Sequence, residues 1–217
     1  AVGSGALLVE TTSSNNTAVG YLAGDAITTG ASNVAIGRDA LGALTTVSDL
    51  TAVGRDALAA NTSGTQNTAV GRTALGVNTT GASNTAVGYL ALDANTTASN
   101  NTAVGNASLG GNTTGSDNTA VGREALLSNT TGASNVAVGS TALDANTTAS
   151  FNTAVGQASL TANTTGNTNT AVGYAALSSN TVGDRSVAVG YLALTAQNPA
   201  TNVDMYNIGV GYNAGAA

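Results

Sequence analysis

Carboxylates and arginines are the main side chains in this chain that could do chemistry. The 217 residues include 11 Asp and Glu and five Arg, with no His, Cys or Lys. Without His or Cys, an enzyme would need paired carboxylates or a Ser–Lys arrangement, and Lys is absent. The nearest paired carboxylates are Asp39 and Asp56, and each directly follows an arginine that would neutralise it. We therefore expect a protein that is not an enzyme and needs no cofactor.

A metal site would need several carboxylates or imidazoles brought together in space. Asp25, Asp93 and Asp144 share one phase of the repeat described below, but they belong to repeats that are not neighbours. No calcium-binding solenoid motif of the form G-G-x-G-x-D occurs, so we expect no metal centre. With a net charge of −6, the chain has little to neutralise phosphates, and we expect no nucleic-acid partner.

A row of Tyr and Arg is the strongest candidate for contact with a partner. It occupies the position directly after a recurring glycine, and both residue types are enriched at binding hot spots. Its members are Tyr21, Arg38, Arg55, Arg72, Tyr89, Arg123, Tyr174, Tyr191 and Tyr212. Three of the arginines precede an acid, as in Arg123-Glu124, so ion pairing and ring stacking explain the row better. We expect these structural roles and keep contact with a host-surface glycan or protein as the alternative.

These candidates are positioned by a 17-residue repeat that covers nearly the whole chain. Its glycine recurs without insertion at Gly3, Gly20, Gly37, Gly54, Gly71, Gly88, Gly105, Gly122, Gly139, Gly156, Gly173 and Gly190. β-Branched residues bounded by Gly and Asn favour short strands, and 17 residues are too few for a helix–turn–helix repeat. We predict an all-β parallel β-solenoid with one coil per repeat. Residues 1–196 would form twelve coils, and residues 197–217 an irregular insertion plus a last coil, acting as a cap or docking segment.

Alternation along each Thr-Ala-Val segment places Thr and Val on one side and Ala on the other. We expect Val inside the coil, with the Leu four residues after the glycine as the main apolar residue of a second short strand. Such an interior is thin, so association of copies would bury more apolar surface. The alanines would then form a self-association face. Its members are Ala35, Ala52, Ala69, Ala86, Ala103, Ala120, Ala137, Ala154, Ala171 and Ala188.

Asn-Thr-Thr-Gly phrases mark a turn in most repeats, as at Asn78 to Gly81. We expect the asparagines, for example Asn95 and Asn101, to stack their amides from coil to coil. Many of them also lie in Asn-x-Thr sequons, which this composition produces by chance. The paired threonines suggest ice binding by a regular Thr array. Adjacent threonines point to opposite sides of a strand, so one of each pair could join such an array.

Three phrases resemble the S-V-A-I-G phrase of YadA-like trimeric autotransporter heads: Ser32-Asn33-Val34-Ala35-Ile36-Gly37, Asn135-Val136-Ala137-Val138-Gly139 and Ser186-Val187-Ala188-Val189-Gly190. The longer phrase N-T-A-V-G-x-x-A-L-x-x-N-T-T-G resembles repeats of phage-type tail fibres and large bacterial surface proteins. The resemblance implies a left-handed parallel β-roll that assembles as a homotrimer. The YadA-like repeat is shorter, so the Asn-Thr-Thr-Gly turn would be an enlargement here.

These inferences point to a structural and adhesive segment of an extracellular fibre, at a cell surface or on a virion. A rigid repeat rod would serve display, attachment or filament assembly, because weak contacts repeated along it add up by avidity. The chain begins and stops inside a repeat, so head-to-tail polymerisation into a filament is an alternative. No stretch approaches the ~20 apolar residues of a membrane span, and we expect no membrane insertion.

Overall fold

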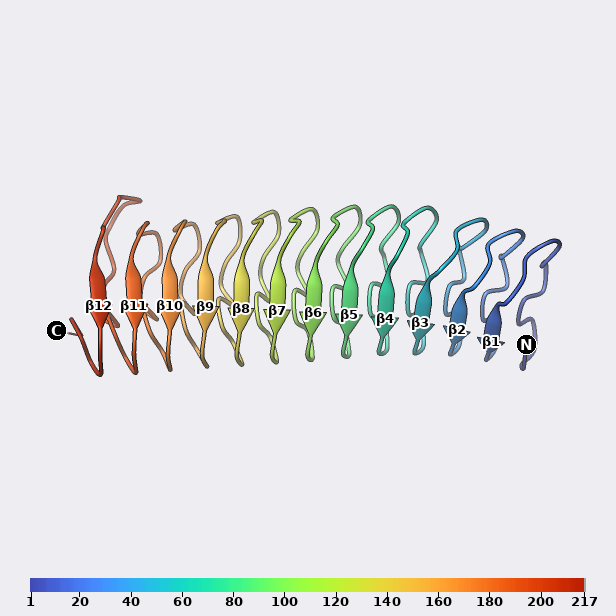
Figure 1. Ribbon diagram of the computed structural model, residues 1–217, viewed down its shortest axis with the longest axis horizontal. Helices are drawn as coiled ribbons and strands as arrows, with labels where there is room; N and C mark the ends of the chain where they lie inside the picture. Colours follow the sequence, from blue (N-terminus) through green and yellow to red (C-terminus); the bar gives the residue numbers. More distant parts are fainter. Residues whose placement is uncertain (217) are drawn as a thin grey trace. The chain divides into compact units, whose positions relative to one another are not determined.

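The computed structural model describes residues 1–216, which fold as an all-β parallel β-solenoid of about 11 coils with 17 residues each. Each coil has one three-residue strand and returns through a series of turns, and no helix occurs among these residues (Figure 1). The predicted all-β parallel β-solenoid with one 17-residue coil per repeat is therefore confirmed. The chain divides into two compact units, Ala1–Ala107 (unit 1) and Ser108–Ala217 (unit 2).

The strands of both units are the three residues that precede a recurring glycine (Figure 1). Unit 1 contains β1 (Thr17–Val19), β2 (Val34–Ile36), β3 (Thr51–Val53), β4 (Thr68–Val70), β5 (Thr85–Val87) and β6 (Thr102–Val104). Unit 2 contains β7 (Thr119–Val121), β8 (Val136–Val138), β9 (Thr153–Val155), β10 (Thr170–Val172), β11 (Val187–Val189) and β12 (Ile208–Val210). Consecutive strands within each unit pair in parallel, so that β4 aligns with β5 through Thr68–Thr85 and Ala69–Ala86. Equivalent residues of successive coils therefore stack in rows, and neighbouring residues within a row are ~4.8 Å apart.

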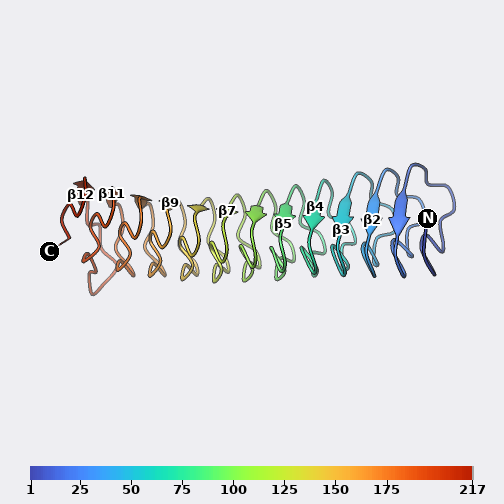
Figure 2. The same ribbon diagram turned by 90° about the horizontal axis from the view of Figure 1, so that it is seen from below.

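The return path of the coils, drawn from a second direction in Figure 2, also forms hydrogen bonds between neighbouring coils of each unit. In unit 1 the amide of Leu75 donates to the carbonyl of Ala91 at 3.1 Å. The amide of Asn78 donates back to the carbonyl of Leu75 at 3.2 Å, closing a turn. Leu75 has a φ of 51°, in the left-handed region that few non-glycine residues adopt. The leucine is thus the buried corner residue of a turn, and its predicted place in a second strand is wrong.

The alanine of each strand points into the coil, and the residues on either side of it point outward. Ala69 and Ala86 are fully buried, whereas Val19 and Val104 are 40% and 36% exposed. The interior space explains this orientation. At Gly209, which takes the alanine position in β12, an added Cβ would lie 2.7 Å from the side chain of Leu194. Leu194 thus lies closer to this position than even a Cβ allows, so the interior there has no space for a side chain as large as valine. Valine stays outside, and the predicted inward orientation of Val is wrong.

The predicted self-association face is wrong for the same reason. Every member of it is at most 1% exposed within the single chain: Ala35, Ala52, Ala69, Ala86, Ala103, Ala120, Ala137, Ala154, Ala171 and Ala188. A side chain with no accessible surface in the folded coil cannot contact a second copy. These alanines and the corner leucines instead form the apolar core of each unit.

Two buried rows of asparagine fasten the coils to one another. In the first row, Nδ2 of Asn78 donates to Oδ1 of Asn61 at 2.8 Å and to the carbonyl of Gly81 at 3.0 Å. In the second row, Nδ2 of Asn84 donates to the carbonyl of Ala98 at 2.9 Å. Within residues 1–216, no buried side-chain nitrogen or oxygen lacks a hydrogen-bond partner. The predicted stacking of amides is confirmed, and the buried amide of Asn78 is out of reach of glycosylation in the folded chain.

The recurring glycine is required by its conformation and by its contact with the next coil. Gly71 has a φ of 139°, which side chains of L-residues rarely permit. An added Cβ at this position would lie 2.2 Å from the carbonyl oxygen of Gly88. Any larger residue would therefore push the two coils apart.

Residues 197–206 interrupt the period in unit 2. Gln197 stands where the first row has asparagine, and its Nε2 donates to Oγ of Ser186 at 2.8 Å. Its Oε1 accepts a hydrogen bond from Nδ2 of Asn207 at 2.8 Å. The segment rejoins the coil at Asp204, which pairs in parallel with Asp184. Its role as a cap or a docking segment stays a prediction.

Candidate interaction surfaces

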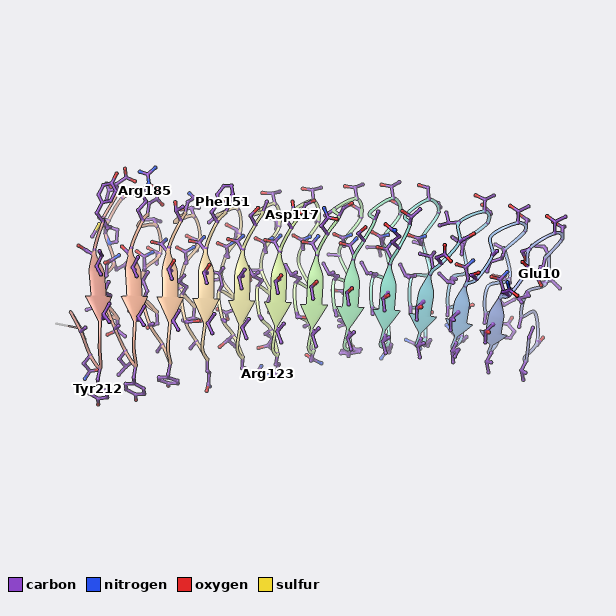
Figure 3. The ribbon with its side chains drawn as sticks, viewed as in Figure 1. Glu10, Asp117, Arg123, Phe151, Arg185 and Tyr212 are labelled. Carbon is purple, nitrogen blue, oxygen red and sulfur yellow. The ribbon has the colours of Figure 1, made fainter. Side chains whose placement is uncertain are left out.

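The Tyr and Arg row lies along the edge that follows each strand. Figure 3 shows Arg123 and Tyr212 of unit 2 projecting beyond the arrowheads of the strands. In the same unit Tyr191 stacks between Tyr174 and Tyr212, with ring centroids 5.2 and 5.3 Å apart. The ring planes are within 16° and 5° of parallel. Stacking covers both faces of the Tyr191 ring, whereas Tyr212, which stacks on one side, is 75% exposed.

In unit 1 the same row consists mostly of arginines, and each contacts a neighbouring side chain of the chain. Arg38 and Arg55 bind the acid that follows each of them, with 2.9 and 3.0 Å between Nε and a carboxylate oxygen. Arg72, which no acid follows, lies over the ring of Tyr89, 5.5 Å from its centroid. Exposed ion pairs contribute only ~0–1 kcal/mol each. The expected pairing of Arg38 and Arg55 and the stacking of tyrosines are confirmed, and contact with a partner stays a prediction.

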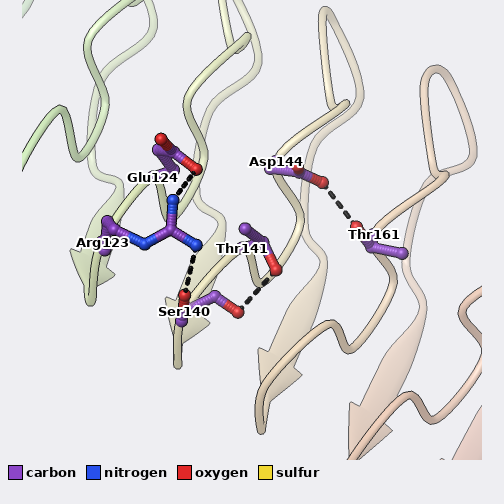
Figure 4. Close-up of polar contacts among 6 residues, drawn as sticks. All are labelled: Arg123, Glu124, Ser140, Thr141, Asp144 and Thr161. Carbon is purple, nitrogen blue, oxygen red and sulfur yellow. Dashed lines mark hydrogen bonds and ion pairs between the residues drawn. The ribbon is translucent and has the colours of Figure 1, made fainter.

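Polar contacts on the outside of unit 2 follow the same pattern (Figure 4). Arg123 forms an ion pair with Glu124 and donates to Oγ of Ser140, in the next coil, at 3.2 Å. The hydroxyl of Thr161 donates to Oδ1 of Asp144 at 2.6 Å, again between coils. The contacts of Arg123 with Ser140 and of Thr161 with Asp144 join neighbouring coils, and both Glu124 and Asp144 are engaged with residues of the same chain.

The acidic residues are spread over the surface. Burial raises the pKa of the Asp93 carboxyl above its usual range. Hydrogen bonds from Ser13 and then from Asn16 lower the pKa of Glu10. In the described part of the chain, no group of three or more His, Cys, Asp or Glu side chains is placed to hold a metal ion. A hollow lies beside the 197–206 segment, where Leu194, Pro199 and Met205 contribute to its lining.

The paired threonines of the turns do not offer a free array of hydroxyls. The hydroxyl of Thr62 donates to the carbonyl of Thr79 at 3.1 Å, and that of Thr79 donates to the carbonyl of Thr96 at 3.0 Å. The first threonine of each pair is thus committed to holding the next coil. The second, as at Thr80, is exposed and forms a single file. The Thr array that the sequence suggested for ice is reduced to one line of side chains.

The strand threonines, which sequence reasoning placed partly inside the coil, are the outward array instead. Thr68 and Thr85 point away from the core in one row, beside the row of buried alanines, and the valines two residues later form the outward row on the other side. The signal that could have found them is the invariably small middle residue of Thr-Ala-Val. A narrow coil accepts that residue inside and leaves its two β-branched neighbours outside.

Comparison of the chain with protein-family models, curated proteins and solved structures finds no match. The residues that the structure describes include no helix long and apolar enough to cross a membrane.

Proposed function

We propose that this chain is a structural and adhesive segment of an extracellular fibre, at a cell surface or on a virion. The observation that carries the proposal is the repetition of one self-sufficient coil. In coil after coil, the same alanine and leucine fill the interior, and asparagines of two rows bind the next coil. Such a segment can be lengthened coil by coil without a new core, as in other solenoids.

The charged and aromatic edge supports the adhesive part of the proposal. Because one Tyr, Arg or polar residue appears there in each coil, any contact that one coil makes is repeated along the edge. Repeated weak contacts add up through effective concentration, so no deep pocket is needed. The partner is a host-surface glycan or protein.

Binding of the chain in multivalent form tests this function. Chains coupled to beads should bind cell-surface glycans or proteins, and removing the edge side chains Tyr174, Tyr191 and Tyr212 together should weaken binding more than removing Thr80. Beads that bind no surface glycan or protein at any coupling density would contradict the adhesive role.

The left-handed coil and the homotrimer belong to this proposal and are supported by the resemblance to YadA-like heads and phage-type tail fibres. The alanine face that would have joined the copies is buried, so the homotrimer has lost that support. Sedimentation equilibrium tests it, since a species with the mass of one chain at high concentration contradicts a trimer. Electron microscopy of the same sample tests head-to-tail filaments.

A further inference from the structure

The outward side of β1–β6 in unit 1 is a regular surface without a charged or aromatic side chain. We name it the unit 1 strand face. Its members are Thr17, Val34, Thr51, Thr68, Thr85 and Thr102 in one row and Val19, Ile36, Val53, Val70, Val87 and Val104 in the other. Every member is β-branched, and none of them is buried. Each coil therefore presents two side chains that carry methyl groups. In five of the six coils one of these side chains is a threonine, which also carries a hydroxyl.

The hydroxyls of this face are free, in contrast to those of the turns. Hydrogen bonds engage the hydroxyls of Thr28, Thr62 and Thr79 within the coil stack. No hydroxyl of Thr17, Thr51, Thr68, Thr85 or Thr102 is hydrogen-bonded to another group in the described chain. These hydroxyls can therefore bind water or a ligand without breaking an existing contact.

The buried asparagines keep this surface regular. Sheets ordinarily twist, and flat ones are typically held by stacking or by side-chain ladders. The second row, which includes Asn67 and Asn84, directly precedes the strands, and the backbone amide of Asn84 lies 2.9 Å from Oδ1 of Asn67. In the first row, Nδ2 of Asn78 lies 2.8 Å from Oδ1 of Asn61. The arrows of β3 to β6 run nearly parallel in Figure 1. The outward groups thus repeat every ~4.8 Å between strands and roughly 6.6 Å along each strand.

From these observations we propose that the unit 1 strand face binds ice. Water molecules bound to the threonine hydroxyls, and ordered around the methyl groups between them, would form a lattice whose few-ångström spacing is similar to that of hexagonal ice. This ordered water then merges with the crystal. Charged side chains, which would orient water around themselves in other directions, are absent from the face.

A second copy of the chain fits this face less well than a water lattice does. Packing two such faces together would bury the free hydroxyls, and each one left without a partner would be strongly unfavourable. The face also lacks the Trp, Tyr and Arg anchors that carry most protein–protein interfaces. Ice satisfies the hydroxyls and needs no large anchor. The proposal applies to a single chain and to any assembly that leaves this side exposed.

Matched substitutions of threonine by tyrosine test the proposal on the full chain. Thr68→Tyr and Thr85→Tyr, made separately, each place a ring on the strand face, where tyrosine suits an exposed strand. Thr80→Tyr places the same ring on the exposed turn row. Far-UV circular dichroism and urea midpoints establish that each variant keeps the fold. Ice activity is measured as thermal hysteresis and as inhibition of ice recrystallisation.

We expect activity in the unaltered chain and in Thr80→Tyr, and a several-fold loss in Thr68→Tyr and Thr85→Tyr. Absence of both ice activities in the unaltered chain, or equal losses in all three variants, would overturn the proposal. So would self-association that Thr68→Tyr abolishes, because the face would then belong to a second copy. Bead binding through the Tyr and Arg edge should be the same in Thr68→Tyr, so the two proposals can fail separately.

Discussion

Substitution of Asn78, in the first asparagine row, by alanine is the sharpest test of what holds the coils together. Its side chain makes three buried hydrogen bonds, two to Oδ1 of Asn61 and the carbonyl of Gly81 and one from Nδ2 of Asn95. After Asn78→Ala the Gly81 carbonyl keeps a second donor at 2.7 Å, and Asn95 keeps its bond to a carbonyl at 3.1 Å. Oδ1 of Asn61 loses its side-chain donor.

The expected loss of stability follows from this inventory. One buried acceptor left unsatisfied costs ~1–3 kcal/mol, and weakening the other two contacts adds roughly 1 kcal/mol. We therefore expect Asn78→Ala to lower the free energy of unfolding by about 2–4 kcal/mol. Asn78→Asp should cost more, because its carboxylate would face the acceptors of Asn61 and Gly81 without a compensating positive charge.

Urea unfolding followed by far-UV circular dichroism measures these differences, and hydrogen exchange locates them. Thr80→Ala is the matched control, since Thr80 lies in the same turn but is exposed, and it should change stability by less than ~0.5 kcal/mol. Amides of the coils next to Asn78 should lose protection before those of β1. If Asn78→Ala stays within ~0.5 kcal/mol of the unaltered chain, the buried row does not stabilise the stack and the reasoning fails.

Three further predictions concern the repeat glycine, the half-buried acid Asp93 and the tyrosine ladder. Gly71→Ala should prevent folding or lower the urea midpoint sharply, because the added Cβ would lie 2.2 Å from a carbonyl oxygen. Gly76→Ala is the control and should lower the midpoint far less, because Gly76 has no positive φ and the nearest atom to its added Cβ belongs to the side chain of Thr73. The raised pKa of Asp93 means that the folded chain binds its proton more tightly, so stability should fall as pH rises from its unfolded to its folded pKa. Asp93→Asn should be the more stable protein at neutral pH in thermal melts, with the advantage vanishing below the unfolded pKa. Tyr191→Ala removes two stacked pairs worth ~0.5–1.5 kcal/mol each and should cost about 1–3 kcal/mol by urea unfolding, whereas Tyr21→Ala, whose ring stacks on no described neighbour, should be nearly neutral.

The architecture could be predicted from the sequence because it follows from the 17-residue period. A glycine at every seventeenth position stacks equivalent residues whatever the details of the coil, so parallel pairing of Ala69 with Ala86 follows from spacing alone. The buried amide rows were predictable too, since asparagine recurs at two phases and its side chain can bond to its own copy. The edge residues were predictable as a row, because any residue at a constant phase falls into line.

The orientation of each strand could not be read in the same way. Alternation separates Ala69 from Thr68 and Val70 but does not say which side is inside, and hydrophobicity favours valine. Only the assembled coil shows that the corner leucine lies against the inner side of the strand, where alanine is buried and no space is left for valine. That leucine itself sits at a positive φ, which propensity disfavours and which the coil-to-coil hydrogen bonds stabilise.

Sequence by itself therefore determined the solenoid, its period, its register and the position of the Tyr and Arg edge, because all of these depend on spacing along the chain. Tertiary structure decided which side of each strand meets solvent and which threonines keep a free hydroxyl. Both depend on the distance between two walls of the coil. That distance is set by packing and hydrogen bonding across it, which no local pattern of residues records.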